Sequence, residues 1–236
     1  MTQADAPLIS VVIPCYNTER YIGEALASVL TQGIESVQIV VIDDGSTDGS
    51  AGVARGFGDR VECRSQPNAG INPARNAGIA LARGKYLAFL DADDLWSPGG
   101  LTLRLGKLRP GLECVFGGVE NFISPDLSPD DAGRFGSIAP AMIGRLAGTM
   151  LIERCAFDRV GLFDTTLKIG EMLDWVARAE KAGIGTVLID DIVLRRRLHA
   201  NNAGIRLKHQ QGDYLKVLRA SLSRRRDAVL KPGGST

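Results

Sequence analysis

The chain has 236 residues, of which 44% are hydrophobic and 23% are charged, and its formal net charge is +1. This length suits one large α/β domain, and a charge so close to zero predicts no nucleic-acid partner. No apolar run approaches the roughly 20 residues that span a bilayer. The polar N-terminus lacks the pattern of a secretory signal. We therefore expect a cytoplasmic protein, either soluble or peripheral at the inner membrane face.

The C-terminal segment differs in charge from the rest of the chain. From Arg195 onward there are eleven Lys and Arg against two Asp. Such a basic tail either contacts a membrane or an anionic partner, or is a solvated helix. Residues 205–230 are compatible with one helix, and its apolar stripe could form the contact of a homodimer. The four cysteines have no Cys-x-x-Cys spacing, which predicts buried, reduced thiols.

The first half of the chain alternates between apolar runs and segments of helical periodicity. Residues 8–13 and 37–42 are continuous apolar runs typical of buried strands, whereas residues 19–32 carry apolar side chains at helical spacing. Strands joined through helices lie parallel, so we predict an α/β fold with a mostly parallel sheet flanked by helices. The expected strands are 8–13, 37–42, 60–64 and 85–90, and the expected helices are 19–32, a short one ending at 57, and 72–82.

The second half is less regular. Residues 124–140 are rich in Pro, Asp, Gly and Ser, which predicts a mobile loop. Residues 170–183 begin with an acidic turn and end at glycine, as a helix does. The other expected elements are helices at 97–108, 155–160 and 205–230 and strands at 114–116, 149–152 and 186–189.

Polar side chains follow three of the predicted strands. Residues 14–17 (PCYN), 43–46 (DDGS) and 91–94 (DADD) each come directly after an apolar run. In α/β sheets of this kind ligands bind beyond the carboxyl ends of the strands. The three clusters therefore predict one binding site at this edge of the sheet.

The chemistry of that site is indicated first by Asp91 and Asp93. Two carboxylates one residue apart can hold Mg²⁺ or Mn²⁺, which neutralises a diphosphate leaving group. Alternatively the segment is a turn with a capping aspartate at Asp94. Asp44 can accept hydrogen bonds from a base or ribose, or can form an Asx turn. Arg75 lies behind a glycine turn, and its planar donor fork suits a base carbonyl or a phosphate.

Four segments of the sequence, in this order and spacing, resemble the family 2 glycosyltransferases of GT-A fold: VVIPCYN, VVIDDGSTDGS, NAGINPARNAG and GKYLAFLDADDLW. The resemblance covers residues 8–110 closely and extends more loosely to about 204. It implies inverting transfer from a nucleoside diphosphate sugar, UDP- or GDP-linked, to a saccharide, lipid-linked or peptide acceptor. We accordingly expect a single glycosyltransferase domain over 1–236, with a nucleotide-sugar-binding half (8–110), an acceptor and catalytic half (111–204) and a basic helical tail (205–236).

The resemblance also implies roles for residues of the donor site. Residues 195–199 resemble an Arg-x-x-His stretch of the family, so that Arg197 would stabilise the diphosphate and His199 would be a further metal ligand, unless the stretch is a solvated turn. For the other positions, Pro14, Tyr16, Asn17 and Glu19 would line the base and ribose, Asp44 would bind the base, Arg75 would contact base or phosphate, and Asp91-Ala92-Asp93 would bridge ribose, metal and diphosphate.

The catalytic base is expected at the start of the helix after Gly170. Many relatives have consecutive Glu and Asp there, the Asp being the base, but Met172 occupies that position here. We rank Glu171 first, because it stands at the helix start nearest the incoming acceptor, and Asp174 second, because a residue three positions further on shares the same helix face. Alternatively Glu171 only stabilises the helix dipole, and the chain is a catalytically inactive nucleotide-sugar-binding partner subunit.

Other enzyme classes fit the sequence less well. A sugar-nucleotide pyrophosphorylase needs a glycine-rich basic loop after its first strand, where this chain has PCYN. A dinucleotide oxidoreductase needs a Gly-x-Gly-x-x-Gly turn after a strand, and the sequence has none.

Overall fold

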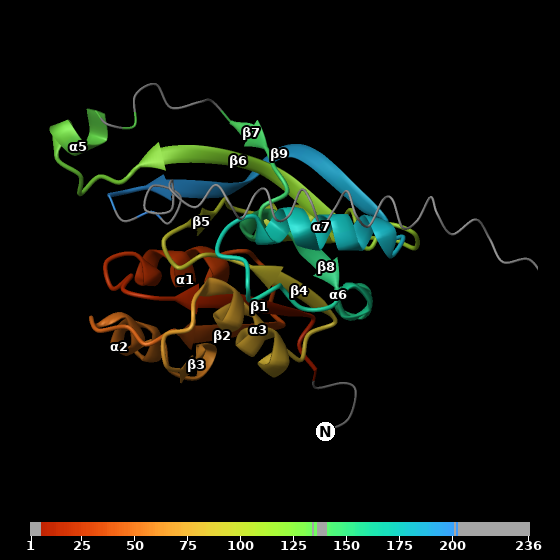
Figure 1. Cartoon of the computed structure of the whole chain (residues 1–236), viewed down its shortest axis with the longest axis horizontal. Coiled ribbons are helices and arrows are strands. Elements are labelled where there is room, and N and C mark those ends of the chain that lie inside the picture. The colour runs from red at the N-terminus through yellow and green to blue at the C-terminus, as the bar shows by residue number, and fades with distance from the viewer. Residues whose placement is uncertain (1–5, 134, 136–140, 201, 203–236) are drawn as a thin grey trace, which may run out of the picture.

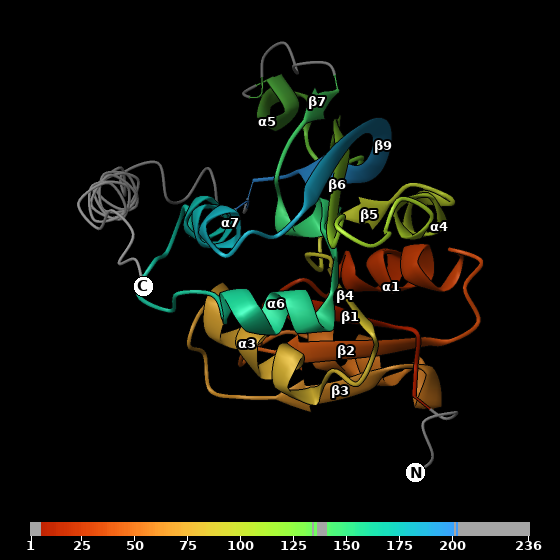
Figure 2. The same cartoon turned by 90° about the vertical axis from the view of Figure 1, so that its right-hand side faces the viewer.

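The computed structural model of the chain describes residues 6–133, 135, 141–200 and 202. These residues build a nine-stranded sheet in the order β3-β2-β1-β4-β8-β6-β9-β5, with β7 added beside β6. Helices cover the sheet, as Figures 1 and 2 show. The predicted α/β class is confirmed. The predicted C-terminal helix, 205–230, lies outside the described residues.

The first half of the sheet is parallel, as its apolar runs predict. β1 pairs in parallel with both β2 and β4, and β2 pairs in parallel with β3. The observed bounds are β1 Ile9–Cys15, α1 Ile22–Leu30, β2 Val37–Asp43, α2 Ser50–Arg55, a short 3₁₀ turn Gly58–Arg60, β3 Glu62–Ser65, α3 Ile71–Leu81 and β4 Tyr86–Phe89.

Alternation along β1 explains how both faces of this half are covered. Val11 and Ile13 pack in the same core cluster as α1 side chains such as Leu26. Val12 points to the opposite face, where it packs with Ile79 of α3. Side chains of a strand alternate between the two faces of a sheet, so helices are needed on both. Because both faces of these strands are covered, their sequences are continuous runs of apolar residues.

The second half of the sheet adds short antiparallel pairs to the predicted, mostly parallel arrangement. β8 runs antiparallel to both β4 and β6, whereas β6 and β9 are parallel. β5 and β7 add antiparallel pairs to β9 and β6. The observed bounds are β5 Leu95–Trp96, α4 Gly100–Leu105, β6 Cys114–Ile123, α5 Pro129–Gly133, β7 Met142–Ile143, a 3₁₀ turn Ala147–Thr149, β8 Leu151–Glu153, α6 Arg154–Val160, α7 Glu171–Lys181 and β9 Thr186–Leu198.

Several predicted elements of this half change in length. The strands predicted at 114–116 and 186–189 are parts of the much longer β6 and β9, which pair along their length with irregularities near Gly118. The helix predicted at 97–108 shrinks to α4, and the loop predicted at 124–140 contains α5. Polar and charged residues interrupt the apolar pattern at the end of β6, whose last four residues are partly or fully exposed, and throughout β9, where buried and exposed positions mix.

An aromatic cluster joins α6 and α7 to the sheet. The Phe157 and Trp175 rings stack with centroids 5.2 Å apart, and the ring of Phe163 packs edge-on against that of Phe89. The Trp175 side chain is fully buried, and its indole N–H donates to the Gly161 carbonyl. Trp175 is therefore a core residue, and its ring is not available to stack on a sugar.

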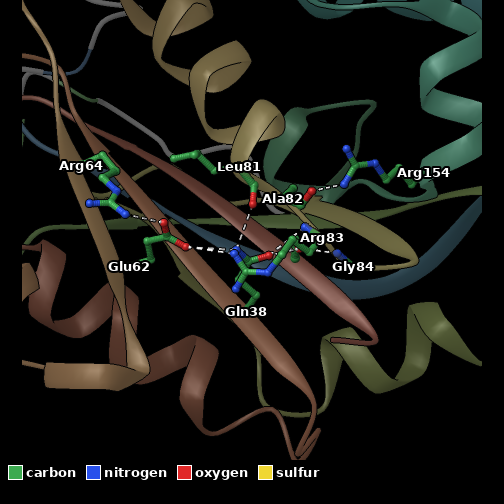
Figure 3. A network of polar contacts seen from close by, with 9 residues as sticks. Gln38, Glu62, Arg64, Leu81, Ala82, Arg83, Gly84 and Arg154 are labelled. Carbon is green, nitrogen blue, oxygen red and sulfur yellow. Dashed lines mark hydrogen bonds and ion pairs between the residues drawn. The ribbon is translucent and has the colours of Figure 1, made fainter. Parts of the chain in front are cut away.

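A polar network ties together the opposite edge of the parallel strands (Figure 3). Gln38 accepts the Arg83 N–H and donates to the Leu81 carbonyl and to Glu62. Arg154 in turn donates to the Ala82 carbonyl. The turn between α3 and β4 is thereby attached to β2 and β3, far from the strand ends that carry the predicted site.

The four cysteines are all free thiols, and their burial is only partly as predicted. Cys15 and Cys114 are buried, Cys63 is partly buried and Cys155 is exposed. Burial raises the pKa of the Cys15 thiol. Among the described residues no helix has the length and apolar character needed to cross a membrane.

Candidate donor-binding site

A pocket of about 580 Å³ opens at the carboxyl ends of β1, β2 and β4. Eight of the residues predicted to bind donor or metal line it. Its full lining is Pro14, Cys15, Tyr16, Asn17, Thr18, Asp44, Asn68, Gly70, Ile71, Ala74, Asp91, Ala92, Asp93 and His199. The sequence clusters thus meet at one edge, as predicted.

The loops after β1 and β2 are connected through Asn17. Its backbone has a φ of +52°, a left-handed conformation that Asn tolerates better than most residues. Its carboxamide oxygen accepts the Thr47 N–H at 2.8 Å, and its own N–H donates to Ser46 Oγ. The second loop therefore holds Asn17, and with it the neighbouring Tyr16, at the pocket wall.

Asp44 orders the turn that leads into α3. One carboxylate oxygen accepts the Ala69 N–H at 3.0 Å and the Gln66 side-chain amide at 2.7 Å, and the other accepts the Gly70 N–H at 2.8 Å. Gly70 has a φ of +101°, which suits glycine. Asp44 therefore builds this wall of the pocket as well as lining it, and its predicted contact with the base stays a prediction.

Asp93 and His199 face each other across the pocket floor. His199 Nε2 lies 2.9 Å from Asp93 Oδ2, although these residues are 106 positions apart. Asp91 Oδ1 accepts from Arg75 at 2.8 Å. Asp94 is buried beneath them, and burial together with the charges of Asp93 and Asp91 raises the pKa of its carboxyl well above the usual range.

These side chains could hold a divalent cation whose coordination shell is completed by atoms of a bound ligand. Over the described residues no group of three or more His, Cys, Asp or Glu side chains is arranged to hold a metal alone. The Asp93 carboxylate and the His199 imidazole supply two adjacent donors, and Asp91 stands beside them. Mg²⁺ and Mn²⁺ commonly take few protein ligands and complete their coordination with phosphate oxygens and water.

Arg197 supports the Asp93–His199 pair from behind. Its guanidinium donates to the Asp93 carbonyl at 3.0 Å and to Glu24 at 2.7 Å, and its backbone N–H donates to Asp94. Arg197 is buried and lies within β9, so residues 195–198 form a strand where the sequence also allowed a solvated turn. The side chain does not line the pocket, and the predicted stabilisation of the diphosphate by Arg197 stays a prediction.

Tyr21 contacts the same group, and sequence reasoning missed it. Its ring packs 4.8 Å from the His199 imidazole and 4.9 Å from the Arg197 guanidinium. Its hydroxyl donates to Asp126 at 3.0 Å, and burial together with this bond raises the pKa of Tyr21. No motif marks Tyr21, because its partners come from distant segments of the chain.

Glu19 also departs from its predicted place. Its carboxylate accepts the Gly49 N–H at 3.0 Å, and its own N–H donates to Asp48 at 3.1 Å. Glu19 is exposed and does not line the pocket. In this structure it joins the loop after β1 to the start of α2, so its effect on a bound nucleoside would be indirect.

The two candidate bases have different surroundings, although both lie in the first turn of α7. Glu171 Oε1 accepts from Arg75 at 2.9 Å, and Arg75 also holds Asp91. Asp174 is buried and pairs with Arg178 at 2.8 Å. Met172 is buried in the core cluster beside Trp175. Glu171 is connected through Arg75 to Asp91 of the pocket wall, and neither Glu171 nor Asp174 lines the pocket itself.

Solved structures of related shape define the class of fold. The chain aligns with Staphylococcus aureus TarS in complex with UDP at a TM-score of 0.68 and 19% identity, covering 90% of this chain and 64% of that one. It aligns with a mannosyltransferase from Pyrobaculum calidifontis in complex with GDP-Man and Mn²⁺ at a TM-score of 0.65 and 18% identity, covering 98% and 66%. The predicted GT-A fold is confirmed.

Sequence relatives define the family. The chain belongs to glycosyl transferase family 2, whose family description matches residues 10–145. It is 30% identical to chondroitin synthase of Pasteurella multocida over 235 residues, covering 93% of this chain and 24% of that protein. It is 29% identical to a glycosyltransferase of Rickettsia prowazekii over 209 residues, covering 83% and 65%. The chain thus spans less than two thirds of the length of these relatives.

Proposed function

We propose that this chain transfers a sugar, with inversion, from a UDP- or GDP-linked donor to an acceptor hydroxyl, with Mn²⁺ or Mg²⁺ bound beside the diphosphate. The observation that carries the proposal is the convergence of Asp91, Asp93 and His199 on one pocket at the strand ends. Nucleotide-sugar complexes of proteins with this fold are consistent with such a donor.

The residues of the pocket divide the task of binding the donor. The ring of Tyr16 and the side chain of Ile71, both partly exposed at the pocket, offer apolar surface to a base. Asp93 and His199 are the residues that would hold the metal, and Asp91 would assist. When bound, the cation neutralises the negative charge that develops on the leaving diphosphate.

The carboxylate of Glu171 is proposed to take the proton from the acceptor hydroxyl. Inversion requires the acceptor to attack from the face opposite to the leaving diphosphate, so the base and the diphosphate lie on different sides of the sugar. Glu171 belongs to α7 in the second half of the sheet, and Asp91 and Asp93 follow β4 in the first half. The fact that Glu171 and these two carboxylates belong to separate elements supports this division of roles.

Release of nucleoside diphosphate tests the proposal. The protein is incubated with Mn²⁺ and either UDP-GlcNAc or GDP-Man, with water or added saccharides as acceptor, and free UDP or GDP is measured. We expect release that depends on Mn²⁺ or Mg²⁺ and is lost in Asp93→Ala. Tight donor binding with no release under any of these conditions would identify the chain as a nucleotide-sugar-binding partner and would overturn the proposal.

A further inference from the structure

Arg75 bridges the two halves of the candidate site from a buried position. Its side chain on α3 is only 3% exposed. One terminal nitrogen donates to Asp91 Oδ1 at 2.8 Å, and the other donates to Glu171 Oε1 at 2.9 Å. Asp91 follows β4, and Glu171 begins α7. One guanidinium therefore joins α3, the loop after β4 and the first turn of α7.

The bridge is held by strong electrostatic constraints. Burial by itself would lower the pKa of Arg75, but Asp91 and Glu171 more than offset this and raise it above its ordinary value. Nε of Arg75 is buried without a hydrogen-bond partner among the described residues. The two carboxylates therefore accept hydrogen bonds from this buried cation and neutralise it, and losing either leaves its charge poorly compensated.

The orientation of Asp91 and Glu171 follows from this contact. Arg75 takes one oxygen of Asp91, and the Asp91 side chain is still 35% exposed at the pocket that it lines. Arg75 does not line the pocket, so its influence on a ligand there passes through the carboxylates it holds. A guanidinium has a rigid planar fork that can meet two carboxylates at once, whereas a lysine ammonium is a single point of charge.

We propose that Arg75 is a positioning residue that couples donor binding at Asp91 to proton transfer at Glu171. The inference rests on the proposed function and assigns this arginine a role different from direct contact with base or phosphate. If the inference is right, losing Arg75 weakens nucleotide affinity only through Asp91. The same loss lowers turnover only through Glu171.

A double-mutant cycle on nucleotide affinity tests the first half of the coupling. Calorimetry measures the Kd of UDP with Mn²⁺ for wild type, Arg75→Gln, Asp91→Asn and the double variant, and GDP replaces UDP if wild type binds only GDP. We expect Arg75→Gln to weaken binding by about tenfold and the double variant to match Asp91→Asn within about twofold. Losses that multiply in the double variant would overturn the inference.

A second cycle on turnover tests the link to Glu171. The kcat and KM for release of UDP from UDP-GlcNAc, or of GDP from GDP-Man, are measured for Arg75→Gln, Glu171→Gln and their combination. We expect Arg75→Gln to lower kcat about tenfold or more in wild type and by less than about twofold in the Glu171→Gln background. A change confined to KM, or an equal loss of kcat in both backgrounds, would contradict the coupling.

Two further variants distinguish a positioning role of Arg75 from a general effect on folding. Arg104→Met removes another buried arginine, which donates to the Gly100 carbonyl and does not line the pocket, so it should change thermal stability without changing the Kd of UDP. Arg75→Lys keeps a buried cation and replaces Arg75→Gln in both cycles if the latter does not fold. Wild type that binds neither UDP nor GDP would refute the proposed function, whereas multiplying losses in an active wild type would refute only the role of Arg75.

Discussion

Glu171 and Asp174 lie three residues apart on α7, yet the structure gives them different partners. Glu171 pairs with Arg75, which also holds a residue of the pocket. Asp174 pairs with Arg178 four residues along the same helix and is buried. The pairing of Asp174 is local to the second half of the chain, which favours a structural role for it and supports the ranking of Glu171 as the base.

This difference predicts different effects of two conservative substitutions on turnover. Glu171→Gln should lower kcat of the folded enzyme by orders of magnitude, because it removes proton transfer, and it should also lower stability, because the buried Arg75 loses one charged partner. Asp174→Asn should cost about 1.5–3 kcal/mol of unfolding free energy through the weakened bond to Arg178, while kcat of the folded enzyme stays close to wild type. Urea unfolding and nucleotide-release kinetics measure the two effects. Full activity in Glu171→Gln together with lost activity in Asp174→Asn would reverse the assignment.

Arg104 is buried and has no carboxylate partner among the described residues. Its guanidinium lies 4.6 Å from the Trp96 ring and donates to the Gly100 carbonyl at 3.0 Å. Burial lowers the pKa of Arg104 to about 9. Since this folded-state pKa lies below the ordinary pKa of arginine, the group contributes stability only at high pH, and that contribution is lost as the pH falls through about 9.

A pH-dependent difference in stability should therefore distinguish Arg104→Met from wild type. At pH 7 we expect Arg104→Met to be as stable as wild type or up to about 4 kcal/mol more stable, because it removes a buried charge while keeping apolar volume. The advantage should shrink as the pH rises above about 9 toward the ordinary pKa of arginine. Urea unfolding across this range measures it, with Arg104→Ala as the control that leaves a cavity. An advantage that is constant with pH would contradict the explanation.

At the scale of elements, the contact between α3 and β1 depends on a glycine. A Cβ added at Gly78 would lie 2.3 Å from Val12 Cγ1, closer than real side chains approach. Gly78 thus lets α3 pack directly on β1, and this packing fixes the position of Arg75 one turn earlier on the same helix. The sequence motif that contains Gly78 and Arg75 therefore combines a packing requirement with a polar one.

Two glycine-to-alanine substitutions should show this contrast. Gly78→Ala should destabilise the protein by about 1–3 kcal/mol through overpacking. Gly52→Ala, within α2, meets nothing within 4 Å and should stabilise it by about 0.5–1 kcal/mol, because alanine favours helix. Chemical denaturation of both variants gives the comparison. Equal stability of the two variants would show that α3 can shift on the sheet without cost.

At the scale of the whole molecule, one sheet carries both halves of the site. β4 of the parallel half pairs with β8, and β8 pairs with β6 of the mixed half. The β9 strand then returns so that His199, just after its end, meets Asp93 beyond β4. A ligand that contacts Asp93 and His199 together therefore binds only when this long-range arrangement is formed.

Binding of a nucleotide with its metal should consequently raise the stability of the native state. At a UDP or GDP concentration about 100-fold above its Kd, with Mn²⁺ present, the gain is about 2.7 kcal/mol, which corresponds to a rise in Tm of about 5–10 °C for a domain of this size. Thermal unfolding monitored by fluorescence measures it. Asp93→Ala should lose the part of the shift that needs Mn²⁺, and an undiminished shift in that variant would remove Asp93 from the metal site.

The sequence by itself determined the parallel half of the fold and the donor side of the site. Unbroken apolar runs, helical spacing and polar clusters at strand ends are local signals, and they correctly placed Asp44, Asp91 and Asp93 at one pocket. The family followed from the same segments, since four motifs in register carry far more information than any one of them.

Only the tertiary structure decided which distant side chains meet. The contacts of Arg75 with Glu171 and of His199 with Asp93 join residues 96 and 106 positions apart, and that of Tyr21 with Asp126 joins residues 105 apart. The tertiary structure also set the lengths of β6 and β9. Their pairing continues through charged residues, and these charged residues interrupt the apolar pattern by which a strand is predicted from sequence. Local periodicity reports which face of an element is buried, but partners across the chain depend on how the elements pack.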